Sequence, residues 1–240
     1  MGSFDLRYEG RSVLIAPAGQ RLLSLLVLSR RTLTREYVAE KLWPDATSTQ
    51  AARCLRSALW RLPRPNRPLV TATASTLQLS PDIETDLAAT EDILHRAITW
   101  SQQWERPVPS ETPTPDVALT DQALGSDLLP EAWDDWVIVE RERLHQMRLH
   151  ALESLAGVHR SAGRFGEALD AALRAVAGEP LRESAHRQVI ETYLAEGNTA
   201  EAIRHFDELR ALLCAELGLE PSPGLCRLVE GAVNAMRTRP

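Results

Sequence analysis

Residues 47–70 read TSTQAARCLRSALWRLPRPNRPLV, a stretch that contains five arginines and no acidic residue. Thr47 followed by Gln50 three positions later matches a capping box, which starts a helix by pairing side chains with free backbone N–H groups. Pro63 lacks the backbone donor that a helix interior needs, so the helix is predicted to end just before it. The stretch therefore predicts one helix over residues 48–62, followed by a rigid proline-rich connector.

The predicted helix has two distinct faces when its residues are placed at about 100° per residue. The apolar face can pack on the rest of a domain, which leaves the other face free to contact a ligand. Arginine binds guanine through a two-pronged contact to O6 and N7, and it also binds phosphate. We therefore expect the outer face to contact DNA. The inner face comprises Ala51, Ala52, Cys54, Leu55, Ala58, Leu59 and Leu62, and the outer face comprises Thr49, Gln50, Arg53, Arg56, Ser57, Trp60 and Arg61.

Two residues of the outer face have alternative roles. Gln50 has a side chain that can bind adenine, but as the last member of the capping box it is predicted to bond to the backbone instead. The Trp60 indole packs against a neighbouring hairpin in one interpretation, and contacts DNA or a neighbouring protomer in the other. Three arginines at the end of the outer face and beyond it are expected to contact phosphate rather than bases; these are Arg61, Arg64 and Arg67.

The segments on either side of this helix predict a winged helix. Runs that alternate apolar and polar residues predict strands, and apolar residues three and four positions apart predict helices. Before the arginine-rich helix we expect a hairpin over 4–15, a break at Pro17 and Gly19, a helix over 20–29, a short strand over 32–34 and a helix over 35–43; after it we expect a hairpin over 69–80. Strands, three helices and a closing hairpin are the element order of a winged helix.

Charge is distributed unevenly along the 240 residues, which together have a formal net charge of -6. Residues 1–80 contain twelve Lys and Arg against five Asp and Glu, whereas residues 81–240 contain fifteen against twenty-eight. Clustered arginine creates a local positive potential whatever the total charge, so the first segment favours a polyanionic partner. The alternative is a solvated charged face, since Lys41 is the only lysine and arginine is the basic residue used throughout.

The residues after 128 contain an internal repeat. SAGRFGEALDAAL at 161–173 aligns with AEGNTAEAIRHFDEL at 195–209 at an offset of 34 residues, with a glycine, a glutamate and an alanine matched. A 34-residue period with small residues at helix crossings is typical of tetratricopeptide repeats, and two copies need further helices to close the stack. We therefore expect closing helices over 130–150 and 222–237, one helix over 84–104, a mobile proline-rich loop over 105–127, and packing of Trp133 and Trp136 between helices of this part.

The sequence has no motif for catalysis, metal binding or a cofactor. A GxxxxGK[ST] loop and an HExxH pair are both absent, and the three cysteines, Cys54, Cys214 and Cys226, form no CxxC pair. We therefore expect no enzyme, no cofactor and no metal site. His145 and His150 are predicted to be solvated on a helix, and the acidic pairs Asp134 with Asp135 and Glu140 with Glu142 to be surface charge.

Nothing in the sequence indicates export or membrane insertion. The start, MGSFDLRYEG, lacks a basic region followed by an apolar run, and the longest apolar cluster, LLSLLVL at 22–28, is too short to span a bilayer. Cysteines that are few and scattered favour a reducing compartment. We therefore expect a cytoplasmic protein without a membrane partner.

Several segments resemble one protein family, the Streptomyces antibiotic regulatory proteins, which join a response-regulator type winged helix to a bacterial transcriptional activator domain. DLLPEAWDDWVIVERERL at 127–144 and the segment 163–223 are similar to the activator domain, and EPLRESAH with ELGLEPSP inside that segment are specific to it. LTREYVAEKLWPDA at 33–46 and AARCLRSALWRL at 51–62 resemble the second helix and the recognition helix of the winged helix. The resemblance covers essentially the whole chain.

The resemblance implies a transcription activator. It implies binding to direct repeats in double-stranded promoter DNA as a side-by-side homodimer, recruitment of RNA polymerase including its sigma subunit, and control of a biosynthetic gene cluster. Matching positions imply that the recognition helix contributes Arg53, Arg56 and Trp60, with base edges contacted by the two arginines. We expect phosphate contacts from the neighbouring arginines and from Thr71 or Thr73, and Arg35 is a further DNA-binding candidate. The resemblance implies polymerase contacts at Trp43, Pro44, Asp45, Ala46 and Thr47.

The hairpin at 69–80 departs from the family pattern. Its segment TATASTLQL contains neither glycine nor arginine, whereas the wing of the family usually turns through glycines. We therefore expect helix 48–62 to supply most of the specificity. We expect no ATPase or sensor module after residue 240, and we expect any regulation by ligand or phosphorylation to act on these two domains.

The predicted fold is mainly α, with an N-terminal winged helix-turn-helix domain over 1–81 and an all-α, tetratricopeptide-like bacterial transcriptional activator domain over 82–240. Two alternative functions share these sequence features. One is an adaptor whose helical part binds a protein, and the other is a repressor that uses the same DNA-binding domain.

Overall fold

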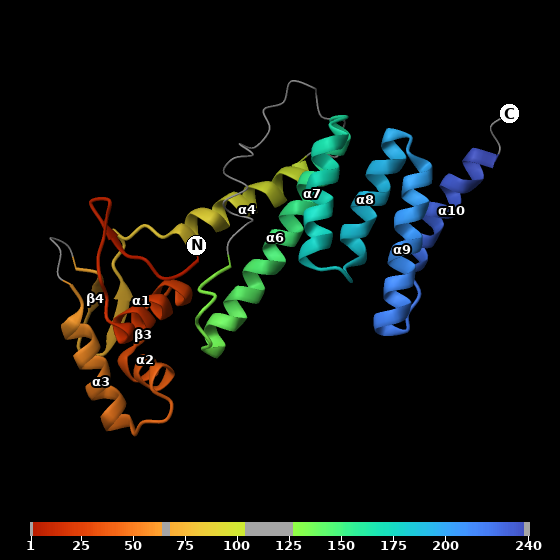
Figure 1. Cartoon of the computed structure of the whole chain (residues 1–240). Coiled ribbons are helices and arrows are strands. Elements are labelled where there is room, and N and C mark those ends of the chain that lie inside the picture. Colours follow the sequence, from red (N-terminus) through yellow and green to blue (C-terminus); the bar gives the residue numbers. More distant parts are fainter. Residues whose placement is uncertain (1, 64–67, 104–126, 238–240) are drawn as a thin grey trace. The chain divides into compact units, whose positions relative to one another are not determined.

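The computed structural model describes residues 2–63, 68–103 and 127–237 (Figure 1). The chain divides into two compact units, which we call the first unit and the second unit. The first comprises Met1–Thr90 and Gly125–Leu144, and the second comprises Glu91–Leu124 and His145–Pro240. This division differs from the predicted boundary after residue 81, because a segment preceding residue 145 packs on the N-terminal core. The predicted mobile loop over 105–127 lies, except for its last residue, outside the described residues.

The first unit is a winged helix, as predicted. A hairpin of β1 (Arg7–Tyr8) and β2 (Arg11–Ser12) precedes α1 (Pro17–Ser29), β3 (Leu33–Thr34), α2 (Arg35–Leu42), α3 (Ser48–Arg61), β4 (Val70–Ala72) and β5 (Thr76–Leu79). The sheet has the antiparallel order β3-β5-β4, with Leu33 opposite Leu77 and Thr71 opposite Gln78. The hairpin β4–β5 is therefore the wing. Strand β3 pairs with β5 and directly precedes α2, so it connects the wing to the helices.

The start of α1 corrects the predicted break at Pro17 and Gly19. Pro17 is the first residue of α1, where its fixed φ suits a helix and its missing N–H costs nothing. Gly19 is buried inside the helix, and a Cβ there would lie 2.9 Å from Ile15 Cγ2 and 3.1 Å from Leu62 Cδ2. A side chain at position 19 would thus crowd Ile15 and Leu62, the C-cap residue of α3.

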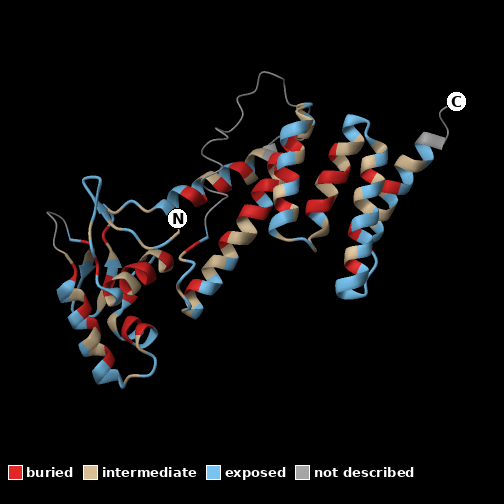
Figure 2. Ribbon diagram, in the orientation of Figure 1, coloured by how far each residue is buried: buried red, intermediate tan, exposed pale blue. Residues whose placement is uncertain are grey.

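The core of the first unit lies between the three helices and the sheet. Its fully buried side chains come from α1, α2, α3 and β5, and the helices expose their other faces (Figure 2). Burial of such apolar side chains stabilises each by about 1.5–3 kcal/mol. The largest of them are Leu22, Leu25, Leu26, Leu42, Leu55 and Leu77.

The segment that starts α6 (Asp135–Ser161) also belongs to the first unit. The Arg21 guanidinium donates to both carboxylate oxygens of Asp134, with Nη2 to Oδ1 at 2.5 Å and Nε to Oδ2 at 3.2 Å. Trp136 packs against the core of this unit, and Trp133 is 79% exposed. The prediction that both tryptophans pack within the helical part is therefore wrong, as is the prediction that Asp134 is only surface charge.

The second unit is all α-helical. Helix α4 (Asp86–Gln103) and α6 begin in the first unit and continue in the second, followed by α7 (Phe165–Gly178), α8 (Glu183–Glu196), α9 (Thr199–Leu217) and α10 (Pro223–Arg237). The first closing helix, predicted over 130–150, starts at Asp135 and runs to Ser161. None of the helices among the described residues is long and apolar enough to cross a membrane.

The 34-residue repeat is confirmed by the positions of α7 and α9, which begin at Phe165 and Thr199. Gly163 and Gly197, which precede these helices, both have a positive φ, of 72° and 93°. A positive φ costs glycine little, so each glycine allows a tight turn between consecutive helices. The matched alanines, Ala168 and Ala202, are fully buried, which lets neighbouring helices approach closely.

The family motif EPLRESAH (179–186) ties α8 to its neighbours. The Arg182 guanidinium donates to Glu153 Oε1 on α6 at 2.7 Å, and the Glu183 carboxylate accepts the Ser222 backbone N–H, just before α10, at 2.8 Å. His186 Nδ1 lies 2.9 Å from His205 Nε2 on α9. The motif thus has a structural role, because Arg182, Glu183 and His186 each contact a residue on another helix or next to its start.

Candidate nucleic-acid interface

Helix α3 begins with the predicted capping box. The Gln50 backbone N–H donates to Thr47 Oγ1 at 3.4 Å, and the Thr47 backbone N–H donates to Gln50 Oε1 at 3.1 Å. The Gln50 side-chain oxygen is therefore engaged in the cap, as the favoured interpretation predicted. The helix ends at Arg61, with Leu62 as its C-cap before Pro63. These local bonds fix where the outer face of α3 starts and ends.

The two faces of α3 are sorted as predicted. Ala51, Leu55 and Ala58 are buried against the core, so the opposite face of the helix is held toward solvent. Each residue assigned to the outer face is exposed: Thr49, Gln50, Arg53, Arg56, Ser57, Trp60 and Arg61.

The arginines on this surface have no acidic partner among the described residues. Arg53, Arg56 and Arg61 are exposed, and none forms an ion pair with a described side chain. Charges that are not neutralised locally raise the potential around the helix and attract an anion. Arg64 and Arg67 lie outside the described residues.

Trp60 stands out on α3 because its side chain is 74% exposed. An indole packed against a hairpin would be largely hidden from water, so the interpretation that Trp60 packs against the wing is wrong. A large apolar side chain that solvent surrounds is available to a partner. The second interpretation, contact with DNA or a protomer, stays a prediction.

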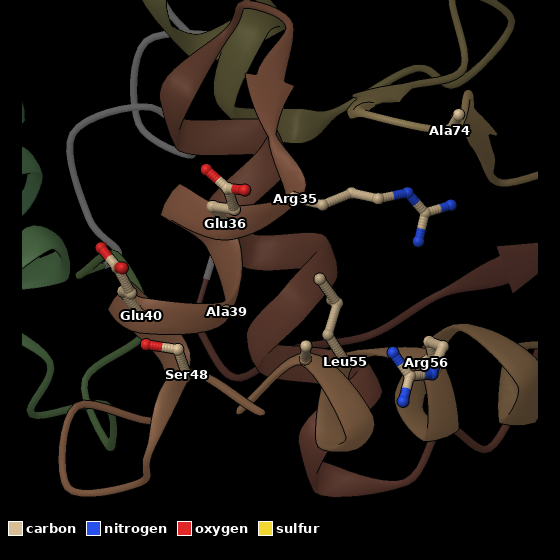
Figure 3. A pocket seen from close by; sticks show the side chains of 9 residues that line it. Arg35, Glu36, Ala39, Glu40, Ser48, Leu55, Arg56 and Ala74 are labelled. Atoms are coloured by element: carbon tan, nitrogen blue, oxygen red, sulfur yellow. The ribbon is translucent and has the colours of Figure 1, made fainter. Parts of the chain in front are cut away.

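A hollow opens between α2, α3 and the turn of the wing (Figure 3). It is lined by Arg35, Glu36, Ala39, Glu40, Ser48, Ala52, Leu55, Arg56 and Ala74. Figure 3 shows the side chains of Arg35 and Arg56 on one side of the hollow, and those of Glu36 and Glu40 on the other. The arginines and the acids therefore give the hollow a positive side and a negative side.

The turn of the wing, residues 73–76, is closed without glycine. The Thr73 hydroxyl accepts the Ser75 and Thr76 backbone N–H groups at 3.3 and 2.9 Å, and it bonds to the Thr76 hydroxyl at 2.7 Å. Threonine hydroxyls form such turns by substituting for backbone acceptors. The Thr73 hydroxyl is thus engaged inside the turn, whereas Thr71 is exposed on β4.

The loop between α2 and α3 contains the predicted polymerase contacts. Trp43 and Ala46 are partly buried and pack against the core, and Thr47 is engaged in the cap of α3. Pro44 and Asp45 are exposed. Only these two of the five predicted side chains are therefore freely presented to a partner protein.

Two features beside α3 were not predicted from the sequence. The acids Glu36 and Glu40 line the hollow, and their four-residue spacing on α2 was the signal available for finding them. Arg35 is bonded to the wing, which no local pattern indicates.

The described residues contain no group of three or more His, Cys, Asp or Glu side chains that could hold a metal ion.

Comparison with protein families identifies the class of this chain. The profile of the bacterial transcriptional activator domain matches residues 104–231, which is more than half of the chain. The chain belongs to the family of proteins that carry this domain, and its resemblance to the Streptomyces antibiotic regulatory proteins is confirmed. The match identifies residues 104–231 as a bacterial transcriptional activator domain.

Two curated relatives are regulatory proteins named AfsR. The protein from Streptomyces coelicolor is 26% identical over 244 residues, and the one from Streptomyces griseus is 25% identical over 224 residues. The matches cover 95% and 92% of this chain, but only 23% and 22% of the relatives. The chain thus spans less than a quarter of the length of these relatives.

A solved structure has the same fold. This structure, of Mycobacterium tuberculosis EmbR in complex with a low affinity phosphopeptide, superposes with a TM-score of 0.75 at 19% identity. The superposition covers 98% of this chain and 64% of that chain. At this identity the likeness shows the fold alone, and it includes both units.

Proposed function

We propose that this chain binds double-stranded promoter DNA by inserting the outer face of α3 into the major groove. One observation carries the proposal: Arg53, Arg56 and Arg61 are exposed on one face of a capped helix, without an acidic partner among the described residues. A structural arginine gains from a partner, whereas a DNA-binding arginine must keep its donors free. The excess of basic residues in the first 80 positions supports the same interpretation.

The proposed assembly is a side-by-side homodimer on direct repeats that recruits RNA polymerase. The exposed pair Pro44 and Asp45 offers a contact for the polymerase, including its sigma subunit, beside the DNA-binding helix. The controlled genes are proposed to form a biosynthetic cluster, and the protein to act in the cytoplasm. Nothing in this function requires a catalytic step, a cofactor or a metal.

Salt dependence of DNA binding tests the proposal. The probe is a labelled duplex with the sequence found upstream of the gene cluster that encodes this chain. A duplex of equal length with a scrambled sequence is the control. If three to five arginines neutralise phosphates, log K should fall against log salt with a slope of roughly -3 to -5 per protomer. Binding that does not respond to salt would contradict the proposal.

Transcription from the same duplex separates activation from repression. Purified polymerase with its sigma subunit should give more transcript when the chain is added, and Asp45→Ala should reduce that gain without weakening DNA binding. A decrease in transcript with the wild-type chain would identify a repressor. A mobility shift that shows one and two protomers on adjacent repeats would support the side-by-side dimer.

The repeat helices favour a second function, a protein-binding adaptor, because stacked helix pairs form extended binding surfaces. The cations between α6 and α8 are already paired, however: Arg160 lies 2.8 Å from Glu191 and donates to Gln188 at 2.7 Å. A peptide carboxylate would have to displace these bonds. Capture of a specific protein by the chain in the absence of DNA, with no shift of promoter DNA, would favour the adaptor.

A further inference from the structure

The wing lacks a cation of its own but is bonded to one. Residues 69–80 contain no lysine or arginine. Arg35, the first residue of α2, donates from its backbone N–H to the Ser75 carbonyl at 2.9 Å, and from Nε to the Thr73 carbonyl at 2.9 Å. Two bonds therefore fix the backbone and the side chain of Arg35 to the turn of the wing.

This bonding leaves the end of the Arg35 guanidinium available. Nε is engaged with the wing, and no acidic side chain among the described residues pairs with Arg35. Its two terminal nitrogens still carry donors in a fixed plane, which is the geometry that binds phosphate oxygens. Because the stem is already held, little side-chain entropy is lost when an anion binds.

Arg56 supplies a second guanidinium to the same hollow. It lies on α3 and lines the hollow together with Arg35, on the side where neither acid lies (Figure 3). Two unpaired guanidinium groups that share a hollow repel each other until an anion lies between them. Glu36 and Glu40 on the opposite side would repel that anion, so its only favourable position is beside the arginines.

We propose that Arg35 and Arg56 together bind one backbone phosphate of the DNA, with Arg35 acting as the cation of the wing. The inference rests on the proposed function, and it assigns Arg56 to the backbone instead of a base edge. The turn of the wing then has a positioning role: it holds Arg35 and does not itself enter a groove. Arg53, one turn earlier on α3, keeps the role of contacting a base.

Glutamine substitutions test the site. Arg35→Gln and Arg56→Gln remove one charge each and should weaken binding by similar factors on the promoter duplex and on the scrambled duplex. The double variant should lower the magnitude of the salt slope by about 1, since one phosphate is lost. A drop of about 2 would mean that each arginine binds its own phosphate, which overturns the shared site. Arg11→Gln, an exposed charge on β2, is the matched control and should change neither quantity.

Duplexes that each carry one neutral methylphosphonate link locate the phosphate. Wild-type protein should bind more weakly to the duplex whose neutral link lies near α3. The variant with both Arg35→Gln and Arg56→Gln should bind that duplex no more weakly than the unmodified one. Arg35→Lys with Arg56→Lys keeps both charges, so this variant should retain the salt slope even if the wing loosens; thermal unfolding of each variant separates that loosening from lost binding. If Arg56→Gln relaxes the preference at a base pair, or Arg35→Gln binds as wild type, the shared site is wrong. Failure of the wild-type chain to bind either duplex would instead refute the proposed function.

Discussion

The arginines of α3 and the arginines of the second unit differ in their partners. Those of α3 lie on the open face of a helix without an acid among the described residues. Several in the second unit pair with acids on a neighbouring helix, on the same helix or across a turn: Arg160 with Glu191, Arg182 with Glu153, Arg204 with Glu201, and Arg210 with Glu220. Composition alone cannot separate the two groups, because arginine is the basic residue in both.

The difference shows that pairing indicates the role of an arginine better than its frequency does. A paired arginine that is largely buried holds helices together, and an exposed pair adds little stability. An arginine that stays unpaired on a rigid surface stabilises nothing in the free protein and is available to an anion. Substitution of a largely buried, paired arginine in the second unit should therefore change stability, and substitution of an arginine on α3 should change DNA binding.

The largest effect is expected for Arg182→Ala in the second unit. Arg182 and Glu153 are 17% and 13% exposed, and Arg182 also donates to Gln146 at 2.8 Å. Its removal leaves the largely buried Glu153 carboxylate with the Ser184 hydroxyl at 2.6 Å and His150 Nδ1 at 3.7 Å as its neighbours, so unfolding should become easier by about 3 kcal/mol. Urea denaturation followed by circular dichroism measures this change.

The matched control is Arg204→Ala, in which the side chain is 67% exposed. Its loss should alter stability by no more than about 0.5 kcal/mol, since solvent screens an exposed pair. If Arg182→Ala and Arg204→Ala lower the free energy of unfolding equally, the distinction between buried and exposed pairs is wrong.

A smaller effect, of a different kind, is expected for Arg53→Ala on α3. Specific DNA binding should weaken by roughly 1–3 kcal/mol and the preference at one base pair should relax, if Arg53 binds guanine. Stability should not change, because the side chain has no partner to lose among the described residues. Fluorescence anisotropy on duplexes with each base at that position measures the preference; an equal loss on all four would make Arg53 a phosphate contact.

The parts of this interface that local patterns encode were predictable. The start and the end of α3 follow from Thr47, Gln50 and Pro63, and its faces follow from the helical period, so no distant residue was needed. The 34-residue repeat was equally predictable, since glycine and alanine are needed at fixed positions in each copy. These features depend on short segments whose energetics are set within one or two helical turns.

The remaining features depend on which segments meet in space. The Arg21–Asp134 bond joins residues 113 positions apart, and the bond from Arg35 to Thr73 joins α2 to a turn 38 positions away. Gly19 suggested a break in the chain, but its lack of a side chain serves packing against Leu62. A pattern of residue types cannot show such contacts, because each partner alone is compatible with solvent.

The capping box provides a test of how far α3 depends on its local sequence. Thr47→Ala removes the acceptor for the Gln50 N–H and should lower stability by about 1 kcal/mol, whereas Thr47→Ser keeps the hydroxyl and should cost little. DNA affinity should fall less than for Arg53→Ala, since the arginines remain. A larger loss of affinity than of stability would show that Thr47 itself contacts the partner.

The smallest effect is expected from pH, through the buried histidines of the second unit. Burial lowers the pKa of His186 below its ordinary value, and burial together with His186 lowers the pKa of His205. His186 Nε2 lies 2.9 Å from the Pro180 carbonyl, so it carries the proton there and Nδ1 accepts from His205 Nε2 in the neutral pair. A proton on His186 Nδ1 would place two N–H groups against each other unless His205 carried its own proton on Nδ1 instead.

The lowered pKa values fix the direction of the pH effect. Just below the unfolded pKa of about 6.5, the unfolded chain binds protons that the folded pair does not, so the free energy of unfolding decreases as pH falls from 7.5 toward 5.5. His205→Asn should flatten this dependence in part, because His159, whose pKa burial also lowers, contributes the same sign. If the free energy of unfolding instead rises as the pH falls over this range, the His186–His205 pair must be protonated more readily in the folded chain than in the unfolded chain.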